Sequence, residues 1–272
     1  MLLAICCAII LLALALPTTS KAEPLIIAHR GASFDAPENT LAAFGLAWNQ
    51  GADGIEADFR LSADGRIVCI HDADTKRVSG KGLVVKDATY AALAALDVGK
   101  WKGEAWRGEK IPTLDEVLDI VPSGKHLFIE LKAGPEIVAP LAEVLERSKP
   151  ATSQIVIICF DGDVLIACKE KLPKYKRHFL ADYRRQEDGS WAPTVDDVIA
   201  RIGRAKADGF GTQNRVEYFD QEFVRRLYAA KIGEFHVWTV DDPRQAQTYR
   251  QLGAWALTTN RPGELRAALA KR

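Results

Sequence analysis

The sequence of 272 residues has no excess charge of either sign, because 36 Lys and Arg residues balance 36 Asp and Glu residues. Such a chain offers no electrostatic argument for a nucleic-acid partner or an anionic membrane surface. Internal repeats, low-complexity tracts and linkers are also lacking, which argues against a repeat array or a string of tethered domains. With 48% apolar residues, the chain can form one domain with a full hydrophobic core.

Cysteine is scarce, at five residues, and no pair has the C-x-x-C spacing of zinc or redox sites. Cys6 and Cys7 lie in the first apolar stretch, which leaves an odd number for the rest of the chain. We expect Cys69, Cys159 and Cys168 to be buried small hydrophobic residues and not disulfide partners or zinc ligands.

One long apolar run without charge spans residues 2–16 and is too short for a comfortable membrane span. Small residues at Ser20 and Ala22 match a signal-peptide cleavage site, so residues 1–22 are predicted to be a signal peptide and residues 23–272 the mature domain. We therefore expect a secreted or periplasmic protein whose mature chain has no stable membrane insertion. No Lys or Arg precedes the run, which leaves an uncleaved anchor as the alternative.

Beyond the leader, short apolar β-rich runs alternate with longer segments of helical period. This alternation is typical of βα units and a parallel sheet. Eight strand–helix pairs in about 250 residues are what a (β/α)8 TIM barrel requires. The predicted strands span residues 25–28, 54–58, 126–131, 154–160, 177–181, 209–212, 235–240 and 255–258, and the predicted helices span residues 40–49, 114–121, 136–147, 161–171, 195–206, 221–230, 243–251 and 262–270.

The rhythm breaks between Asp72 and Pro112, where Gly, Lys and Trp are frequent and the helical period is lost. A hairpin-like segment from residues 62 to 72 leads into this stretch. We expect a long excursion after the second strand that contributes to a substrate mouth, because long connections are usually functional or mobile. A shorter polar excursion, residues 183–191, follows the fifth strand and could line the same rim.

Three carboxylates follow neighbouring predicted strands. Glu56 and Asp58 are two residues apart on the second strand, so they face the same side. Glu130 ends the third strand, and in a barrel the strand ends converge on one mouth. Three like charges aimed at one place are costly unless a cation is bound. An all-oxygen set favours Mg²⁺ or Ca²⁺ over zinc.

Basic side chains surround this predicted metal position. Arg30 and Lys132 next to the cation would form a site for an oxygen cluster such as phosphate. His29 and His71 each change charge near neutral pH, so they could be general acid and general base in the cleavage of a phosphate ester. Strand seven adds His236 and Trp238, and Trp238 is the candidate for a substrate contact.

Each residue alone also has a purely structural explanation. A strand-end histidine can simply be hydrogen bonded, Lys132 could neutralise Glu130, Arg30 could neutralise Asp58, and a tryptophan often belongs to the core. Six ionisable groups at the ends of three adjacent strands are poorly explained in that way, because strand ends in a barrel core normally carry apolar residues. Convergence therefore favours the functional interpretation.

The run His29-Arg30-Gly31-Ala32, followed by Pro37-Glu38-Asn39-Thr40, closely resembles the opening signature of the glycerophosphodiester phosphodiesterase family. The resemblance continues in the family's order, at similar spacings, over essentially all of the mature chain. It takes in Glu56-x-Asp58, the Asp64-Gly65 turn, His71-Asp72 with Arg77, Ile111-Pro112-Thr113-Leu114, Glu130-x-Lys132 and Val237-Trp238-Thr239-Val240.

The resemblance implies a (β/α)8-barrel enzyme that hydrolyses glycerophosphodiesters, the deacylated phospholipid head groups, to sn-glycerol 3-phosphate and an alcohol. By the same resemblance, Glu56, Asp58 and Glu130 would hold one divalent cation, Ca²⁺ or Mg²⁺. His29 and His71 would be the acid and base pair.

Arg30 and Lys132 would hold the phosphate by this resemblance. In the family's reaction a neighbouring glycerol hydroxyl attacks phosphorus first and gives a cyclic phosphate that water opens. An intramolecular nucleophile avoids much of the entropy cost of recruiting water.

The chain departs from the family pattern after the last strand, where the usual Thr-Asp-x-Pro is Thr259-Asn260-Arg261-Pro262. Asparagine keeps the size and the hydrogen-bonding capacity of aspartate, so we expect a tuned mouth and a working enzyme. Gln213 or Asn214 could face substrate, but the pattern there does not decide.

Two other functions compete with this one. A phospholipase D-like enzyme on the same barrel would cleave lysophospholipids or sphingomyelin and should show an exposed apolar patch, which the loops do not concentrate. A non-catalytic phosphodiester-binding protein should have lost a metal ligand or a histidine, and none is lost here.

Overall fold

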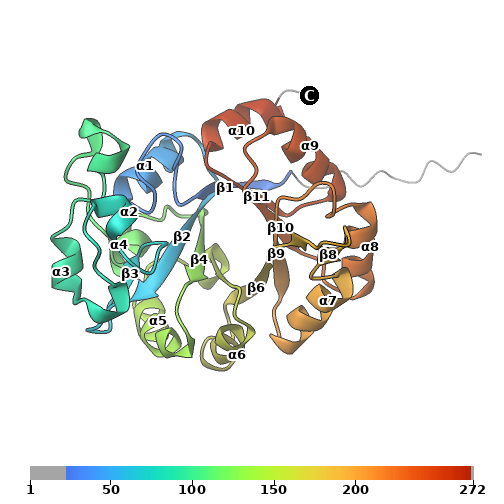
Figure 1. Cartoon of the computed structure of the whole chain (residues 1–272), viewed down its shortest axis with the longest axis horizontal. Helices are drawn as coiled ribbons and strands as arrows, with labels where there is room; N and C mark the ends of the chain where they lie inside the picture. The colour runs from blue at the N-terminus through green and yellow to red at the C-terminus, as the bar shows by residue number, and fades with distance from the viewer. Residues whose placement is uncertain (1–22, 271–272) are drawn as a thin grey trace, which may run out of the picture.

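The computed structural model describes residues 23–270, which form a strand barrel surrounded by helices (Figure 1). The predicted signal peptide, residues 1–22, lies outside the described residues. Among the residues that are described, no helix has the length and apolar character needed to span a membrane.

Eight parallel strands close the barrel, as predicted. They pair in the order β1, β11, β10, β9, β6, β5, β4, β2, and β2 pairs again with β1. Each predicted strand is found; β2 extends to Leu61 because its last residues pair with the antiparallel β3 (Ile67–Cys69) of the predicted hairpin. The strands are β1 (Leu25–His29), β2 (Gly54–Leu61), β4 (His126–Leu131), β5 (Ile155–Cys159), β6 (Lys176–Ala181), β9 (Gly209–Gln213), β10 (Phe235–Trp238) and β11 (Ala256–Thr259).

The helices predicted between the strands form the outer ring (Figure 1). Side-chain caps fix where several of them begin. Thr40 accepts a hydrogen bond from the Ala43 N–H at the start of α1, and Thr113 forms a capping box with Glu116 at the start of α4. The ring consists of α1 (Leu41–Asn49), α4 (Leu114–Asp119), α5 (Val138–Glu146), α6 (Gly162–Lys171), α7 (Val195–Arg204), α8 (Gln221–Ala229), α9 (Pro243–Leu252) and α10 (Pro262–Ala270).

Alternate strand residues divide the apolar side chains between two clusters. Ile27 of β1 and Phe128 of β4 belong to the cluster inside the barrel. Their neighbours Ile26 and Leu127 belong to the larger cluster between strands and helices. This alternation fills the barrel interior with side chains, and the polar groups lie at the C-terminal strand ends.

The long excursion is ordered and has a small core of its own. It contains α2 (Lys76–Ser79), α3 (Tyr90–Ala94) and three 3₁₀ turns. Eight buried side chains form its cluster: Val68, Ile70, Val78, Val85, Leu93, Leu96, Val98 and Ile111. The second excursion forms a short hairpin of β7 (Arg184–Arg185) and β8 (Trp191–Ala192).

The cysteine prediction is confirmed. Cys69, Cys159 and Cys168 are buried, and all three are free thiols. Burial raises the pKa of the Cys159 and Cys168 thiols to about 12, which keeps them protonated and unreactive near neutral pH.

Candidate active site

The three predicted carboxylates meet at one end of the barrel. One oxygen from each of Glu56, Asp58 and Glu130 lies within 4.8 Å of the others, and all three residues are buried. Parallel strand ends explain this meeting, because β2 and β4 are neighbours and Asp58 is in register with Glu130. Glu56 Oε1 has no hydrogen-bond partner among the described residues. The cluster therefore offers negatively charged oxygen ligands, which fit a hard divalent cation.

The electrostatics of the cluster show the cost of keeping these carboxylates together. Burial raises the pKa of Glu56 well above its usual range, and the charges of Asp58 and Glu130 raise it further. Burial also raises the pKa of Glu130, to about 7, with Asp58 adding to the effect. Burial acts in the same direction on Asp58, but Arg30 and Lys132 outweigh it and hold the pKa of that carboxyl below its usual range. A divalent cation would relieve this repulsion.

Lys132 and Arg30 flank the carboxylates from two sides. Lys132 Nζ lies 2.5 Å from Glu130 Oε1 and 3.3 Å from Asp58 Oδ1. Arg30 Nε lies 3.1 Å from Asp58 Oδ2, and the Arg30 backbone N–H donates to Glu56 Oε2 at 3.0 Å. Both of the neutralising ion pairs considered from sequence are therefore present. Both side chains also line the cavity described below, so their charges are presented to a ligand.

His29 is held by Asn260, at the position where the chain departs from the family pattern. The Asn260 Nδ2 donates to Asp241 Oδ2 at 2.6 Å, which turns the amide oxygen Oδ1 toward His29 Nδ1 at 2.8 Å. A carboxylate and an amide oxygen can only accept, so the His29 proton is on Nδ1 and Nε2 is free to accept. Nε2 lies 3.9 Å from Glu56 Oε2. Burial, with Arg30 adding its charge, lowers the pKa of His29 to about 4.

His71 is held through its Nδ1 as His29 is, but by residues at the start of the long excursion. Its Nδ1 lies 2.7 Å from Asp72 Oδ1, and Arg77 Nε donates to Asp72 Oδ2 at 2.6 Å. Arg77 also binds Glu38, which in turn accepts from Arg30. Burial lowers the pKa of His71, partly opposed by Asp58 and Asp72. Each of the two histidines therefore has an oxygen acceptor behind Nδ1.

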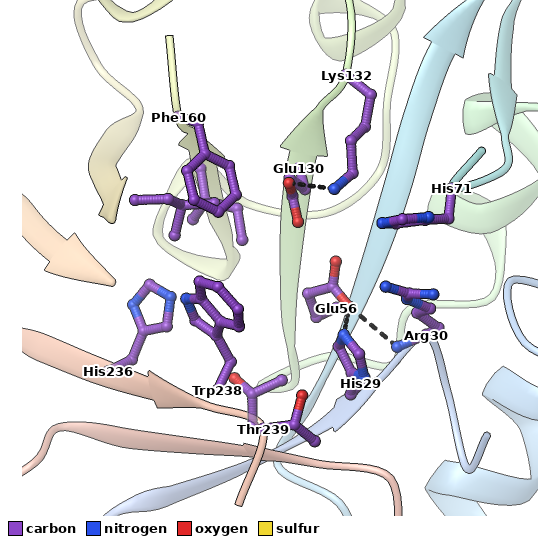
Figure 2. A pocket seen from close by; sticks show the side chains of 13 residues that line it. His29, Arg30, Glu56, His71, Glu130, Lys132, Phe160, His236, Trp238 and Thr239 are labelled. Carbon is purple, nitrogen blue, oxygen red and sulfur yellow. Dashed lines mark hydrogen bonds and ion pairs between the residues drawn. The ribbon is translucent and has the colours of Figure 1, made fainter. Parts of the chain in front are cut away.

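A cavity of about 220 Å³ joins these groups (Figure 2). Seven of the eight residues predicted for the site line it, and the eighth, Asp58, is fully buried within the carboxylate cluster. Gln213 and Asn214 do not line it; they are hydrogen bonded to Tyr183 and Thr239. The lining residues are His29, Arg30, Glu56, His71, Glu130, Lys132, Ile158, Phe160, Leu180, His236, Trp238, Thr239 and Thr258.

Sequence reasoning missed the residues that position the predicted ones. Asn39 donates to Asp58 Oδ2 at 2.8 Å and accepts from the Asp58 backbone N–H, so it fixes that carboxylate. Asp241 fixes Asn260. Asn39 lies within a motif quoted for the resemblance, and the unusual Asn260 was a visible signal. Nothing in the sequence pattern pointed to Asp241.

The closed barrel and the cavity at its strand ends define the class: this is a TIM barrel with carboxylate, basic and histidine side chains gathered in one cavity. The comparison with family models makes the assignment specific. Residues 29–264 match the glycerophosphoryl diester phosphodiesterase family. The chain belongs to this family and is a phosphoric diester hydrolase.

Relatives from several bacteria support this assignment. A glycerophosphodiester phosphodiesterase of Caldanaerobacter subterraneus is 44% identical over 158 residues, which are 57% of this chain and 65% of that protein. A Mycobacterium tuberculosis protein named Probable glycerophosphodiester phosphodiesterase 1 is 31% identical over 91% of this chain and 93% of its own.

Solved structures agree with both the fold and the family. The structure of an Oleispira antarctica phosphodiesterase in complex with the product sn-glycerol-3-phosphate superimposes with a TM-score of 0.80 and 28% identity. That match covers 92% of this chain and 98% of the other. The predicted (β/α)8 barrel is thereby confirmed.

Proposed function

We propose that the protein hydrolyses glycerophosphodiesters to sn-glycerol 3-phosphate and an alcohol, with one divalent cation, Ca²⁺ or Mg²⁺, held by Glu56, Asp58 and Glu130. The observation that carries the proposal is that one cavity contains this carboxylate cluster and two histidines. The Oleispira relative, which binds sn-glycerol-3-phosphate, supports the choice of product.

The chain's own charges suit the binding of a phosphodiester. Arg30 and Lys132 can each donate to non-bridging phosphoryl oxygens from the cavity wall. The cation, when bound, supplies positive charge that stabilises negative charge developing on those oxygens. Because the histidine rings are fixed through Nδ1, the geometry is set before substrate arrives.

The two histidines differ in a way that assigns their roles. His29 is partly buried and backed by the neutral Asn260 oxygen, and its lowered pKa of about 4 favours the unprotonated ring at neutral pH, so it takes the proton from the attacking glycerol hydroxyl. Burial lowers the pKa of His71 as well, but Asp58 and Asp72 oppose that shift. The Asp72 carboxylate at Nδ1 stabilises the imidazolium form, so His71 is the residue that gives a proton to the leaving alcohol oxygen. The attacking oxygen forms a bond to phosphorus as the leaving P–O bond breaks, and the product is a cyclic phosphate. Water then opens the ring with the two roles exchanged.

His29→Ala and His71→Ala test this assignment. Each change should lower turnover of glycerophosphocholine by about 10²- to 10⁴-fold, the usual effect of losing a general acid or base. ³¹P NMR of the reaction would detect sn-glycerol 3-phosphate and any cyclic phosphate. The melting temperature of each variant serves as the control for folding. Retention of turnover by either folded variant would refute its role.

Cleavage of lysophospholipids remains an alternative substrate proposal. The observation in its favour is Phe160, which lines the cavity and is 42% exposed. Lysophosphatidylcholine offered beside glycerophosphocholine decides between them, because a head-group enzyme releases sn-glycerol 3-phosphate from the second and is slow on the first.

A further inference from the structure

Two buried histidines inside the barrel have no part in the chemistry described so far. His178 and His236 are 0% and 1% exposed. Their rings stack with centroids 5.3 Å apart, and the two Nδ1 atoms are 3.1 Å apart. Glycines of β9 make room for them: a Cβ at Gly209 would lie 2.5 Å from His178, and one at Gly211 would lie 2.4 Å from His236. The pair is therefore built into the barrel interior.

The proton positions on this pair follow from Glu234. Its Oε2 lies 3.4 Å from His178 Nε2 as an ion-pair contact and not as a hydrogen bond, and Lys176 Nζ holds the same carboxylate at 2.7 Å. The negative charge of the carboxylate favours the His178 tautomer with its proton on Nε2, in which Nδ1 accepts. His236 Nδ1 must then donate across the 3.1 Å contact. This leaves His236 Nε2 unprotonated.

Burial keeps both imidazole rings neutral, as the proton positions described above require. It lowers the pKa of His178, with Glu234 opposing, and it lowers the pKa of His236 well below the usual range. Neither ring therefore carries a charge near neutral pH, and the arrangement is one of fixed donors and acceptors.

The residue that carries this free nitrogen belongs to the active-site cavity. His236 lines the cavity beside Trp238, on the wall opposite His71 and Arg30 (Figure 2). Neither His236 Nε2 nor Trp238 Nε1 has a hydrogen-bond partner among the described residues. One is an acceptor and the other a donor, and they lie two residues apart on β10. An alcohol hydroxyl both donates and accepts, so a hydroxyl of a bound ligand suits either an unpartnered acceptor or an unpartnered donor.

We propose that His236 is a specificity-determining residue, whose Nε2 accepts a hydrogen bond from an alcohol hydroxyl of the bound phosphodiester, and that Glu234 is a positioning residue acting through His178. The inference rests on the proposed function for the class of ligand. The hydroxyl belongs either to the glycerol retained in the product or to the leaving alcohol.

Binding measurements show whether the hydroxyl belongs to the glycerol or to the leaving alcohol, and they do not depend on turnover. Calorimetry with saturating Mg²⁺ or Ca²⁺ would give Kd values for sn-glycerol 3-phosphate and for ethyl phosphate, which lacks hydroxyls. His236→Phe should weaken the first by about 3- to 10-fold and leave the second unchanged, as loss of one hydrogen bond predicts. His236→Gln should keep part of the preference, because its amide oxygen can accept.

A leaving-alcohol hydroxyl gives a different pattern. His236→Phe would then lower kcat/KM for glycerophosphoglycerol relative to glycerophosphoethanol, with Kd for sn-glycerol 3-phosphate unchanged. Equal weakening of every ligand, or no change in either comparison, would overturn the proposal. If the wild-type enzyme turned over no glycerophosphodiester, the proposed function would fail, while the Kd comparison would still test His236.

The positioning role has its own readout, which also serves if His236→Phe does not fold. The ¹⁵N shift of His236 Nε2 should be that of an unprotonated ring nitrogen in the wild type. Glu234→Gln should mix the two ring forms and reduce the preference for sn-glycerol 3-phosphate. Lys176→Met is the matched control, since it removes the ion pair to Glu234 but keeps the contact with His178. A protonated Nε2 in the wild type, or equal effects of the two variants, would contradict this role.

Discussion

Removing divalent cations should lower the melting temperature of the protein, because the buried carboxylates would then face one another without their counter-ion. The ligand oxygens of Glu56, Asp58 and Glu130 lie within 4.8 Å of each other. A ligand present at about 100 times its Kd stabilises the native state by about 2.7 kcal/mol. Each kcal/mol shifts the melting temperature of a domain of this size by about 2–4 °C. We therefore expect chelation to lower it by about 5–10 °C.

The Glu56→Gln variant tests this prediction further, because its effect on the melting temperature should change sign when the cation binds. In chelator the variant should melt at or above the wild-type temperature, because burial and the neighbouring charges disfavour ionised Glu56. At saturating Ca²⁺ or Mg²⁺ it should melt below the wild type, because one ligand is lost. Scanning fluorimetry over a metal titration measures both orders. Glu170→Gln, at an exposed position on α6, is the control that should follow the wild type throughout. A melting temperature insensitive to both cations would refute the reasoning.

Three further outcomes are expected. Asn260→Asp places a carboxylate at His29 Nδ1 and should raise the pKa of His29 from about 4. Because the general base must be unprotonated, the acid limb of the plot of kcat/KM against pH should then move to higher pH. An acid limb that does not move would count against His29 as the base. Asn39→Ala frees the Asp58 carboxylate and should weaken cation affinity in a calorimetric titration; unchanged affinity would contradict that positioning role. The buried thiols should resist a thiol reagent in native protein that comprises residues 23–272 and react fully in denaturant, whereas reaction without denaturant would show that they are accessible.

The barrel itself could be predicted because each strand leaves a local signature. A parallel strand buried on both faces appears as a short apolar run, and each lies next to a segment of helical period. The small core of the long excursion could not be predicted in this way. Val78, Val85 and Leu93 are separated by irregular turns, so no period marks them as partners.

The candidate site was predictable where a local rule places side chains on one face. Glu56 and Asp58 follow the period of a strand, and the strand-end rule brings Glu130 to them. Contacts between distant strands follow no such rule. His178 and His236 lie on β6 and β10, with β9 between them in the sheet, and their pairing depends on glycines of that middle strand.

Release of sn-glycerol 3-phosphate from glycerophosphocholine and glycerophosphoethanolamine, before and after chelation and after return of Ca²⁺ or Mg²⁺, tests the central claim most directly. The account predicts release that stops with chelator and resumes when either cation is restored. Full activity in the presence of chelator, or no release with either cation, would contradict it.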